Sequence, residues 1–202
     1  MPESPEDLYA RVMESADADG RLPMPPIATW DIFPWDGEIS TRPLQPPVPE
    51  EPAREGAPGG APCGRCADPS RNVIWENERW TVCSTSSPSG MPLIVFLMPK
   101  EHLDYADLDD EMAAECGRLS VWLTRIIERL DGIGRVHVMK IGDGAEHLHV
   151  WFFARPAGLL QVRGSAVPEW DDILPPVPED IWRADLAQVA RQLATHEGRV
   201  VD

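Results

Sequence analysis

Two short segments carry the side chains best suited to chemistry. The first, residues 146–151, holds His147 and His149 with a single residue between them. Residues two apart in a β-strand point to the same face, so His147, His149 and Trp151 are expected on one side, with apolar residues on the other. A neutral imidazole is a nucleophile or a metal ligand near pH 7. An ordinary pair of sheet histidines has the same pattern, so this segment alone does not decide between the two interpretations.

The second segment is the pair Cys63 and Cys66, separated by two residues. Two thiolates at this spacing can hold one zinc ion, which needs two further ligands to complete a tetrahedron. Free cysteines in a loop are one alternative. A redox pair is another, but it favours a strand followed by a helix, whereas Pro62 and Gly64 indicate a loop. The missing ligands must come from elsewhere in the chain.

Strands that would position these residues are predicted from apolar runs. The stretches 73–76 and 79–82 flank a tight turn and are typical of a hairpin. The apolar run 93–98 has the length of a strand and ends at Pro99. Two more strands are expected over 136–141 and 148–153, joined by the short turn 142–144.

Two amphipathic helices complete the pattern. The longer one has Asp residues suited to its start and Gly132 at its end. A second helix is expected to start near Pro178 and to end by Gly198. The apolar stripes are Met112, Cys116, Leu119, Leu123, Ile126 and Leu130 in the first, and Trp182, Leu186, Val189 and Leu193 in the second. Strands and helices in this order predict an α+β fold with a mostly antiparallel sheet.

The N-terminal region has a different composition. Ser4 and Pro5 favour a helix start, and the helix should end by Gly20. The aromatic-rich stretch 30–35 is expected to pin this arm onto the domain. Residues 41–62 are rich in Pro, Gly and Glu and predict an extended connector.

Composition narrows the possible partners and location. The net charge of -16 argues against a surface that coats nucleic acid, which needs a basic face. The first residues have neither the basic nor the apolar region of a signal peptide, and no apolar run is long enough to span a bilayer. Four cysteines in such a chain indicate reduced thiols and a cytoplasmic location.

Taken together, the motifs resemble the histidine triad (HIT-like) superfamily and its relative galactose-1-phosphate uridylyltransferase. The family pattern is a strand ending in Pro-Lys-x-His, an amphipathic helix, and a strand bearing alternating histidines. Here these are residues 99–102, the long helix and residues 147–151. The resemblance covers about residues 60 to 160, and the extensions on either side resemble those of actinobacterial HIT-like proteins. It implies a HIT-like domain over 63–160, an N-terminal arm and connector over 1–62, and a C-terminal extension with a helix over 161–202.

The resemblance also implies roles for individual residues. Several family members bind structural zinc through Cys-x-x-Cys, the Pro-Lys-x-His histidine and the first triad histidine. The matching ligands here are Cys63, Cys66, His102 and His147. In catalytic members the middle histidine attacks the α-phosphorus of a nucleotide, and its equivalent is His149. Its second ring nitrogen should donate to a nearby backbone carbonyl, which would keep the reactive nitrogen free.

Two departures from the family pattern affect the expected chemistry. Trp151 replaces the third histidine, so it either donates to a phosphate oxygen or simply packs. The loop before His147 is short and carries Asp143 and Glu146, which would repel phosphate unless turned away. Backbone N–H groups in that loop remain available to a ligand. The candidate substrate-binding residues are therefore Trp151, Gly142, Gly144 and Lys100.

Three functional interpretations follow. The first is a nucleotidyl hydrolase or transferase that acts through a covalent His149 intermediate on a nucleoside phosphate ester, anhydride or phosphoramidate. The second is a nucleotide-binding module without turnover, and the third is an enzyme for a non-nucleotide anionic metabolite. A homodimer is also expected, because many HIT proteins pair through the long helix and because Trp122 lies off the apolar stripe. A partner subunit would cover Trp122; the N-terminal arm is the alternative cover.

Overall fold

A computed structural model describes residues 4–201, which form two compact units divided after Pro52. In the first unit, helix α1 (Pro5–Met13) begins at Ser4, whose hydroxyl accepts a hydrogen bond from the Asp7 backbone N–H, as predicted. A short 3-10 turn covers Pro26–Thr29. The remainder is irregular, and the Tyr9 hydroxyl donates to the carbonyl of Leu44 across it.

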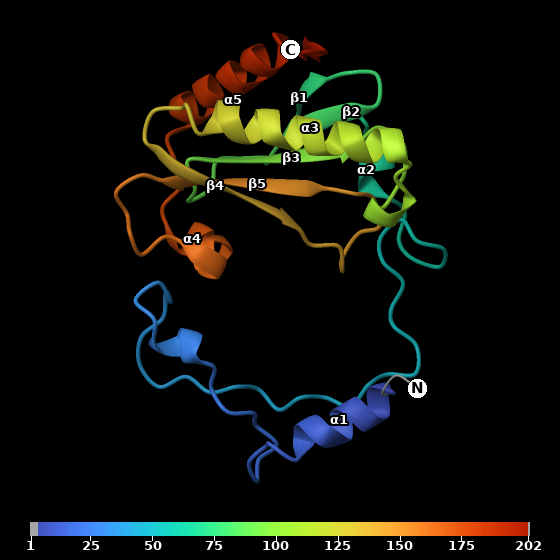
Figure 1. Cartoon of the computed structure of the whole chain (residues 1–202), viewed down its shortest axis with the longest axis vertical. Coiled ribbons are helices and arrows are strands. Elements are labelled where there is room, and N and C mark those ends of the chain that lie inside the picture. The colour runs from blue at the N-terminus through green and yellow to red at the C-terminus, as the bar shows by residue number, and fades with distance from the viewer. Residues whose placement is uncertain (1–3, 202) are drawn as a thin grey trace. The chain divides into compact units, whose positions relative to one another are not determined.

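The second unit is built on one antiparallel sheet with strand order β4-β5-β3-β2-β1-β6. The central strands follow the predicted hairpin and apolar runs, and the long helix lies between β3 and β4 in the chain (Figure 1). The α+β class and the antiparallel sheet are therefore confirmed. The strands are β1 (Val73–Glu76), β2 (Trp80–Ser84), β3 (Leu93–Pro99), β4 (Ile133–Lys140), β5 (Val150–Pro156) and β6 (Arg199–Val200).

Both predicted helices pack on one face of this sheet. Helix α3 (Asp110–Ile127) is capped by Asp109, and helix α5 (Glu179–Ala194) lies beside α3 in Figure 1. Every residue of the two predicted apolar stripes is buried. They share one core with inward-facing residues of the central strands, among them Trp75, Trp80 and Phe152. The C-terminal helix thus belongs to the same core as the sheet.

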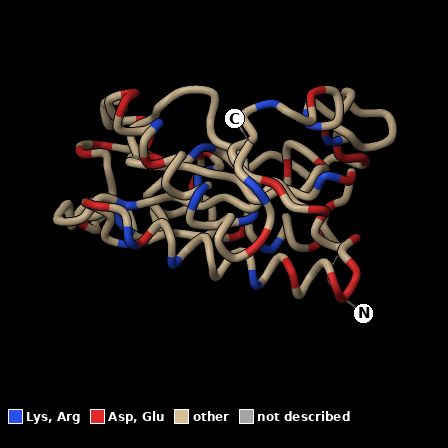
Figure 2. The backbone as a smooth tube through the Cα atoms, turned by 90° about the horizontal axis from the view of Figure 1, so that it is seen from above, with Lys and Arg blue, Asp and Glu red and all other residues tan. Residues whose placement is uncertain are grey.

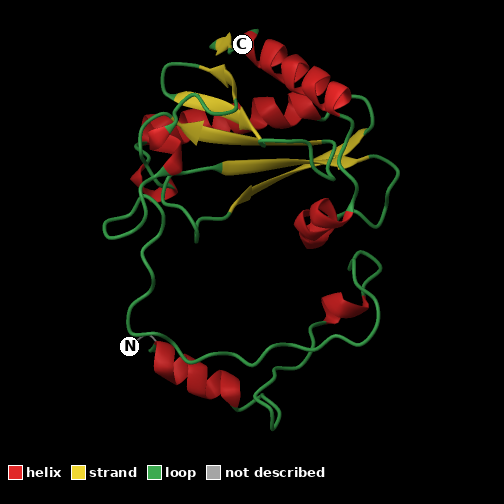
Figure 3. Ribbon diagram, turned by 180° about the vertical axis from the view of Figure 1, so that it is seen from behind, coloured by secondary structure: helices red, strands yellow, loops and turns green. Residues whose placement is uncertain are grey.

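The opposite face of the sheet is partly covered by helix α4 (Val167–Ile173), which the sequence did not predict. Figure 3 shows α4 across the sheet from the other two helices. Val167 packs there with Met91, Ile94 and Phe153 in a second, smaller apolar cluster. The part of this face that α4 leaves uncovered lies near the two chemistry-bearing segments.

Two details differ from the sequence expectations. Strand β5 begins at Val150 instead of Leu148, because the N–H of Leu148 donates to the Leu103 carbonyl outside the sheet. Trp122 is half-buried, and a residue of its own unit packs on it. The imidazole of His196, just past α5, stacks on it with ring centroids 4.7 Å apart. Within residues 4–201, no helix combines the length and apolar character of a bilayer span.

Candidate metal centre and active site

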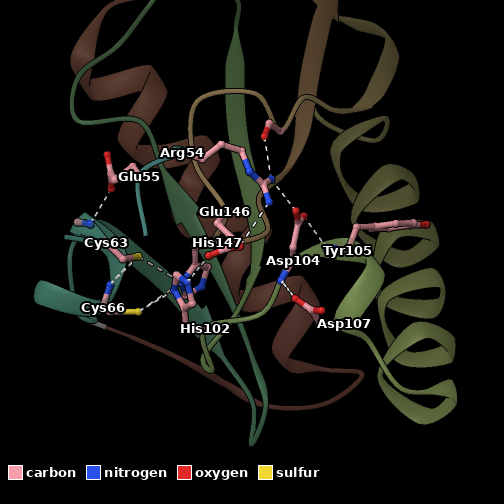
Figure 4. A network of polar contacts seen from close by, with 12 residues as sticks. Arg54, Glu55, Cys63, Cys66, His102, Asp104, Tyr105, Asp107, Glu146 and His147 are labelled. Atoms are coloured by element: carbon pink, nitrogen blue, oxygen red, sulfur yellow. Dashed lines mark hydrogen bonds and ion pairs between the residues drawn. The ribbon is translucent and has the colours of Figure 1, made fainter. Parts of the chain in front are cut away.

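Four side chains from three separate segments meet at one end of the sheet. Cys63 caps the short helix α2 (Gly64–Ala67), Cys66 lies within it, His102 follows β3, and His147 precedes β5. One ligand atom of each lies within 4.8 Å of all the others. Cys66 Sγ is 3.3 Å from His102 Nδ1 and 3.5 Å from His147 Nδ1. Figure 4 shows the sulfurs and imidazoles pointing toward one another.

The second nitrogen of each imidazole has a partner outside the cluster. Nε2 of His147 lies 2.9 Å from the carbonyl oxygen of Pro99 and donates to it. Nε2 of His102 lies 3.4 Å from the carboxylate of Glu146. Such outer bonds fix the tautomer and leave the Nδ1 lone pairs facing the centre. The donor set of two thiolates and two oriented imidazoles fits tetrahedral zinc.

The electrostatics of the cluster favour the protonation state of a metal ligand at Cys63 and His147, whereas burial raises the pKa of Cys66, and hydrogen bonds with Cys63 and Glu146 raise that of His102. Burial lowers the pKa of His147, which keeps its imidazole neutral. Burial acts to raise the pKa of Cys63, but hydrogen bonds from the Cys66 backbone and side chain and from His102 outweigh it, so the net shift is downward. A neutral imidazole and a thiol that ionises readily are both suited to binding a cation.

Residues from the predicted connector hold this cluster in place. Arg54 pairs with Asp104 at 2.6 Å, reaches Glu146 at 3.5 Å and donates to the Gly142 carbonyl at 3.0 Å. Glu55 exchanges backbone hydrogen bonds with the loop before His147 and accepts from the Gly64 N–H at 2.6 Å (Figure 4). Glu146 is therefore turned toward Arg54 and His102.

His149 lies next to the cluster without belonging to it. Its Nδ1 is 2.9 Å from the backbone carbonyl of His147 and donates to it, so the bond expected from the sequence is present and Nε2 is left free. The imidazole lines a cavity of about 330 Å³ together with Cys63 and His147. Cys83 of β2 and Phe96 and Met98 of β3 also line this cavity. A free imidazole nitrogen at the edge of a small cavity can act as a nucleophile or a proton acceptor.

Solved structures with the same arrangement of helices and sheet settle the fold. A histidine triad protein from Bradyrhizobium japonicum has a TM-score of 0.50 at 14% identity, covering 60% of this chain and 89% of that one. A histidine triad protein from Marinobacter aquaeolei has a TM-score of 0.50 at 20% identity, covering 65% of this chain and 93% of that one. This chain has the histidine triad fold.

One further neighbour is structurally more distant, and two other comparisons found no match. A zinc-bound histidine triad family protein from Mycobacterium smegmatis has a TM-score of 0.47 at 19% identity, covering 65% of this chain and 95% of that one. No protein-family model and no curated protein matches the chain. The fold is thus shared with histidine triad proteins, while the activity must be argued from this chain's own residues.

Trp151 takes the place of the third histidine on this histidine triad fold, and it is packed among other rings. Its indole lies edge-on to Phe96 with centroids 4.5 Å apart and is stacked on Phe153 at 5.3 Å. The ring of His149 is 5.9 Å away. The indole N–H is buried and has no hydrogen-bond partner among the described residues. Packing is therefore shown, and a contact to phosphate stays a prediction.

The other predicted substrate-binding residues do not meet at the cavity. The ammonium of Lys100 pairs with Glu76 at 2.9 Å, where Arg199 also binds. Gly142 and Gly144 face the connector through their carbonyls, which accept from Arg54 and from the Glu55 N–H. Ala145 is the loop residue that lines the cavity.

Sequence reasoning missed two groups of residues at this site. Arg54, Glu55 and Gly56 lie in a stretch without periodicity, which gave no signal that it folds onto His102 and Glu146. Arg65 and Arg71 line the cavity from the segment that follows the first cysteine. Arg65 lies inside the Cys-x-x-Cys motif, so the sequence could have predicted that it is close to the cluster. The sequence could not have predicted that its side chain points into the cavity.

Proposed function

We propose that the chain is a nucleotidyl hydrolase or transferase that acts at the α-phosphorus of a nucleoside phosphate ester, anhydride or phosphoramidate. The observation that carries this proposal is the His149 imidazole, which faces the cavity with Nδ1 bound to the His147 carbonyl. The histidine triad fold supports the proposal by analogy only.

In the proposed reaction His149 Nε2 attacks phosphorus, a nitrogen–phosphorus bond forms, and the bond to the leaving group breaks. Positive charge develops on the imidazole as Nε2 becomes bonded. The His147 carbonyl accepts from Nδ1–H and stabilises that charge at the moment it appears. Water or another acceptor then cleaves the nitrogen–phosphorus bond and restores the free imidazole.

Cys63, Cys66, His102 and His147 would hold a zinc ion with a structural role. Four protein ligands leave no open position, so the ion would stabilise the fold and would not activate water. His147 would thereby be fixed at one end, and its backbone carbonyl orients His149 at the other. We propose one zinc per chain. Metal analysis of protein purified without chelator should find it, and Cys63→Ser should lose both the metal and much of the thermal stability.

The test of the nucleophile is a rapid quench in alkaline denaturant with a nucleotide labelled at the α-phosphate, since an imidazole–phosphorus bond survives base but not acid. Wild type should carry an acid-labile label, and His149→Ala should carry none while keeping its zinc content and melting temperature. His137→Ala, which changes a histidine outside the cavity, should label normally. Full turnover by His149→Ala would contradict the covalent mechanism.

A nucleotide-binding module without turnover is the second candidate. The packing of Trp151 favours it, because an indole N–H cannot accept and return a proton as a histidine can. Nucleotide binding by the wild type with no label and no product would support this candidate over the enzyme.

A further inference from the structure

The cavity beside His149 contains two guanidinium groups from the segment that begins at the metal cluster. Arg65 is half-buried and Arg71 is exposed, and both line the cavity. The chain as a whole is acidic, with 18 basic against 34 acidic residues. Figure 2 shows basic positions interspersed with acidic ones along the backbone.

Neither guanidinium is paired with a carboxylate within residues 4–201. Arg65 donates to the Thr81 hydroxyl at 3.0 Å and to the Arg71 carbonyl at 3.3 Å. Arg71 donates to the Ser86 hydroxyl at 3.4 Å. These acceptors are neutral, so they orient the guanidinium groups without cancelling their charge. By contrast, Arg54, Arg79, Arg118, Arg183 and Arg199 each have a carboxylate partner.

The acidic residues of the cavity are already engaged with local donors. Glu55 accepts from the Gly64 N–H at 2.6 Å, and Asp68 accepts from the Ser70 hydroxyl at 3.0 Å. The cavity thus offers two oriented cations beside a free imidazole.

We propose that Arg65 and Arg71 bind a second anionic group of the substrate, a phosphoryl group apart from the one that His149 attacks. This inference rests on the proposed function and narrows its substrate class to small molecules with two phosphoryl groups. A guanidinium is suited to this role because its donors match the oxygens of a phosphate in pairs. The second phosphoryl group has two possible sources: the leaving group of an anhydride, or the sugar of a nucleoside bisphosphate.

Calorimetric titration of zinc-loaded His149→Ala protein tests the proposal without turnover. The probes are adenosine 5′-monophosphate, adenosine 5′-diphosphate and adenosine 3′,5′-bisphosphate. One of the two doubly phosphorylated probes should bind roughly ten- to a hundredfold more tightly than the monophosphate, and which one does so identifies the source. Adding Arg65→Gln should remove that preference and leave monophosphate affinity within about twofold. Arg183→Gln, which removes a positive charge from α5, should keep the preference.

The outcomes separate the two proposals. Equal affinity for all three probes overturns the inference and leaves the proposed function standing. A preference that survives Arg65→Gln and Arg71→Gln together also overturns it, because the second group is then held elsewhere. Binding of none of the three probes contradicts the proposed function and the inference with it. A zinc assay and a melting curve on each variant show whether it is folded, so a loss of preference can be assigned to the missing guanidinium.

Discussion

His147 links the metal cluster to the candidate nucleophile through three of its own atoms. Its Nδ1 faces the two thiols, its Nε2 donates to Pro99, and its carbonyl accepts from His149. Rotation of its ring would break the first two contacts, and movement of its backbone would release His149. We infer that the cluster keeps the candidate nucleophile in one orientation without lying in the path of a ligand.

Gly56 is the residue that lets the connector lie against His102. Its φ is +89°, and an added Cβ would come within 2.5 Å of His102 Cε1. Gly56→Ala should therefore push the imidazole away from the thiols and weaken zinc binding by roughly ten- to a hundredfold. Competition with a chromophoric chelator measures this.

Gly59→Ala is the matched control for that substitution. Gly59 has a φ of +83° with no atom within 4 Å of an added Cβ. The Gly59→Ala variant should lose about 1 kcal/mol of stability, because alanine is strained in the left-handed backbone conformation, and it should keep its zinc affinity. If both variants bind zinc equally, the close approach of Gly56 to His102 does not affect zinc binding.

At the scale of elements, helix α3 is fastened to the hairpin by a buried carboxylate that the apolar stripe did not reveal. Glu115 accepts from the Trp80 indole N–H at 3.1 Å and from Arg79 Nε at 2.8 Å. Asn77 in the hairpin turn donates to its other oxygen at 2.9 Å. The carboxylate thus supplies a hydrogen-bond acceptor to the N–H of a fully buried indole, which solvent does not reach.

Glu115→Ala should lower the free energy of unfolding by about 3 kcal/mol, because it leaves the Trp80 N–H buried without a partner. Glu111→Ala is the control on the same helix. Glu111 also reaches Arg79, but its side chain is 83% exposed, so its loss should cost less than about 0.5 kcal/mol. Urea denaturation followed by tryptophan fluorescence compares the two. Equal losses would show that the buried carboxylate is not a special anchor.

The central elements were predictable because burial on one face leaves a period in the sequence. The stripe from Met112 to Leu130 and the apolar run of β3 gave both the element and its inward face. The start of β5 was not predictable, since the Leu148 N–H bonds to the Leu103 carbonyl and the His147 side chain to the Pro99 carbonyl instead of to a neighbouring strand. Strand β6 is only two residues long and pairs with β1 through a contact distant in sequence.

The meeting of the four candidate ligands beside His149 was predicted, but the surroundings of the site were not. The resemblance to the histidine triad pattern implied that Cys63, Cys66, His102 and His147 share one centre, and one ligand atom of each lies within 4.8 Å of the others. Arg54 acts through contacts 50 to 92 residues away in sequence, Glu55 bonds to the distant loop before His147, and no periodic pattern records such contacts. The placement of Lys100 beside Glu76 likewise depends on how β1 pairs, not on the motif around Lys100.

At the scale of the whole molecule, residues 53–62 belong with the sheet and not with the arm. A chain that begins at Ala53 should keep its zinc content and its melting temperature, since the contacts around the cluster come from Arg54 onward. A chain that begins at Cys63 should bind zinc more weakly and melt lower. Zinc analysis and thermal melts of both fragments measure this. Equal behaviour of the two would mean that residues 53–62 are a linker, as their composition alone suggests.

The homodimer remains a prediction, but its basis has changed. Trp122 no longer argues for it, because His196 already covers that ring. The remaining surface is the groove of about 450 Å³ between α3 and β4, where Tyr105 and Val138 are exposed. Strand β4 is also at the edge of the sheet, so its outer backbone groups have no strand partner among the described residues. An exposed edge beside an apolar groove favours pairing with a second copy.

Light scattering at micromolar concentration should therefore give about twice the chain mass of 22.4 kDa. Val138→Asp should reduce it to the mass of one chain, because a charge would be buried at the pairing edge without a partner. Ile181→Asp changes a comparably exposed apolar residue on α5, and it should leave the mass doubled. A single-chain mass for the wild type would rule out the pairing. If both variants stay dimeric, the interface lies on another face and the α3–β4 groove is free to solvent.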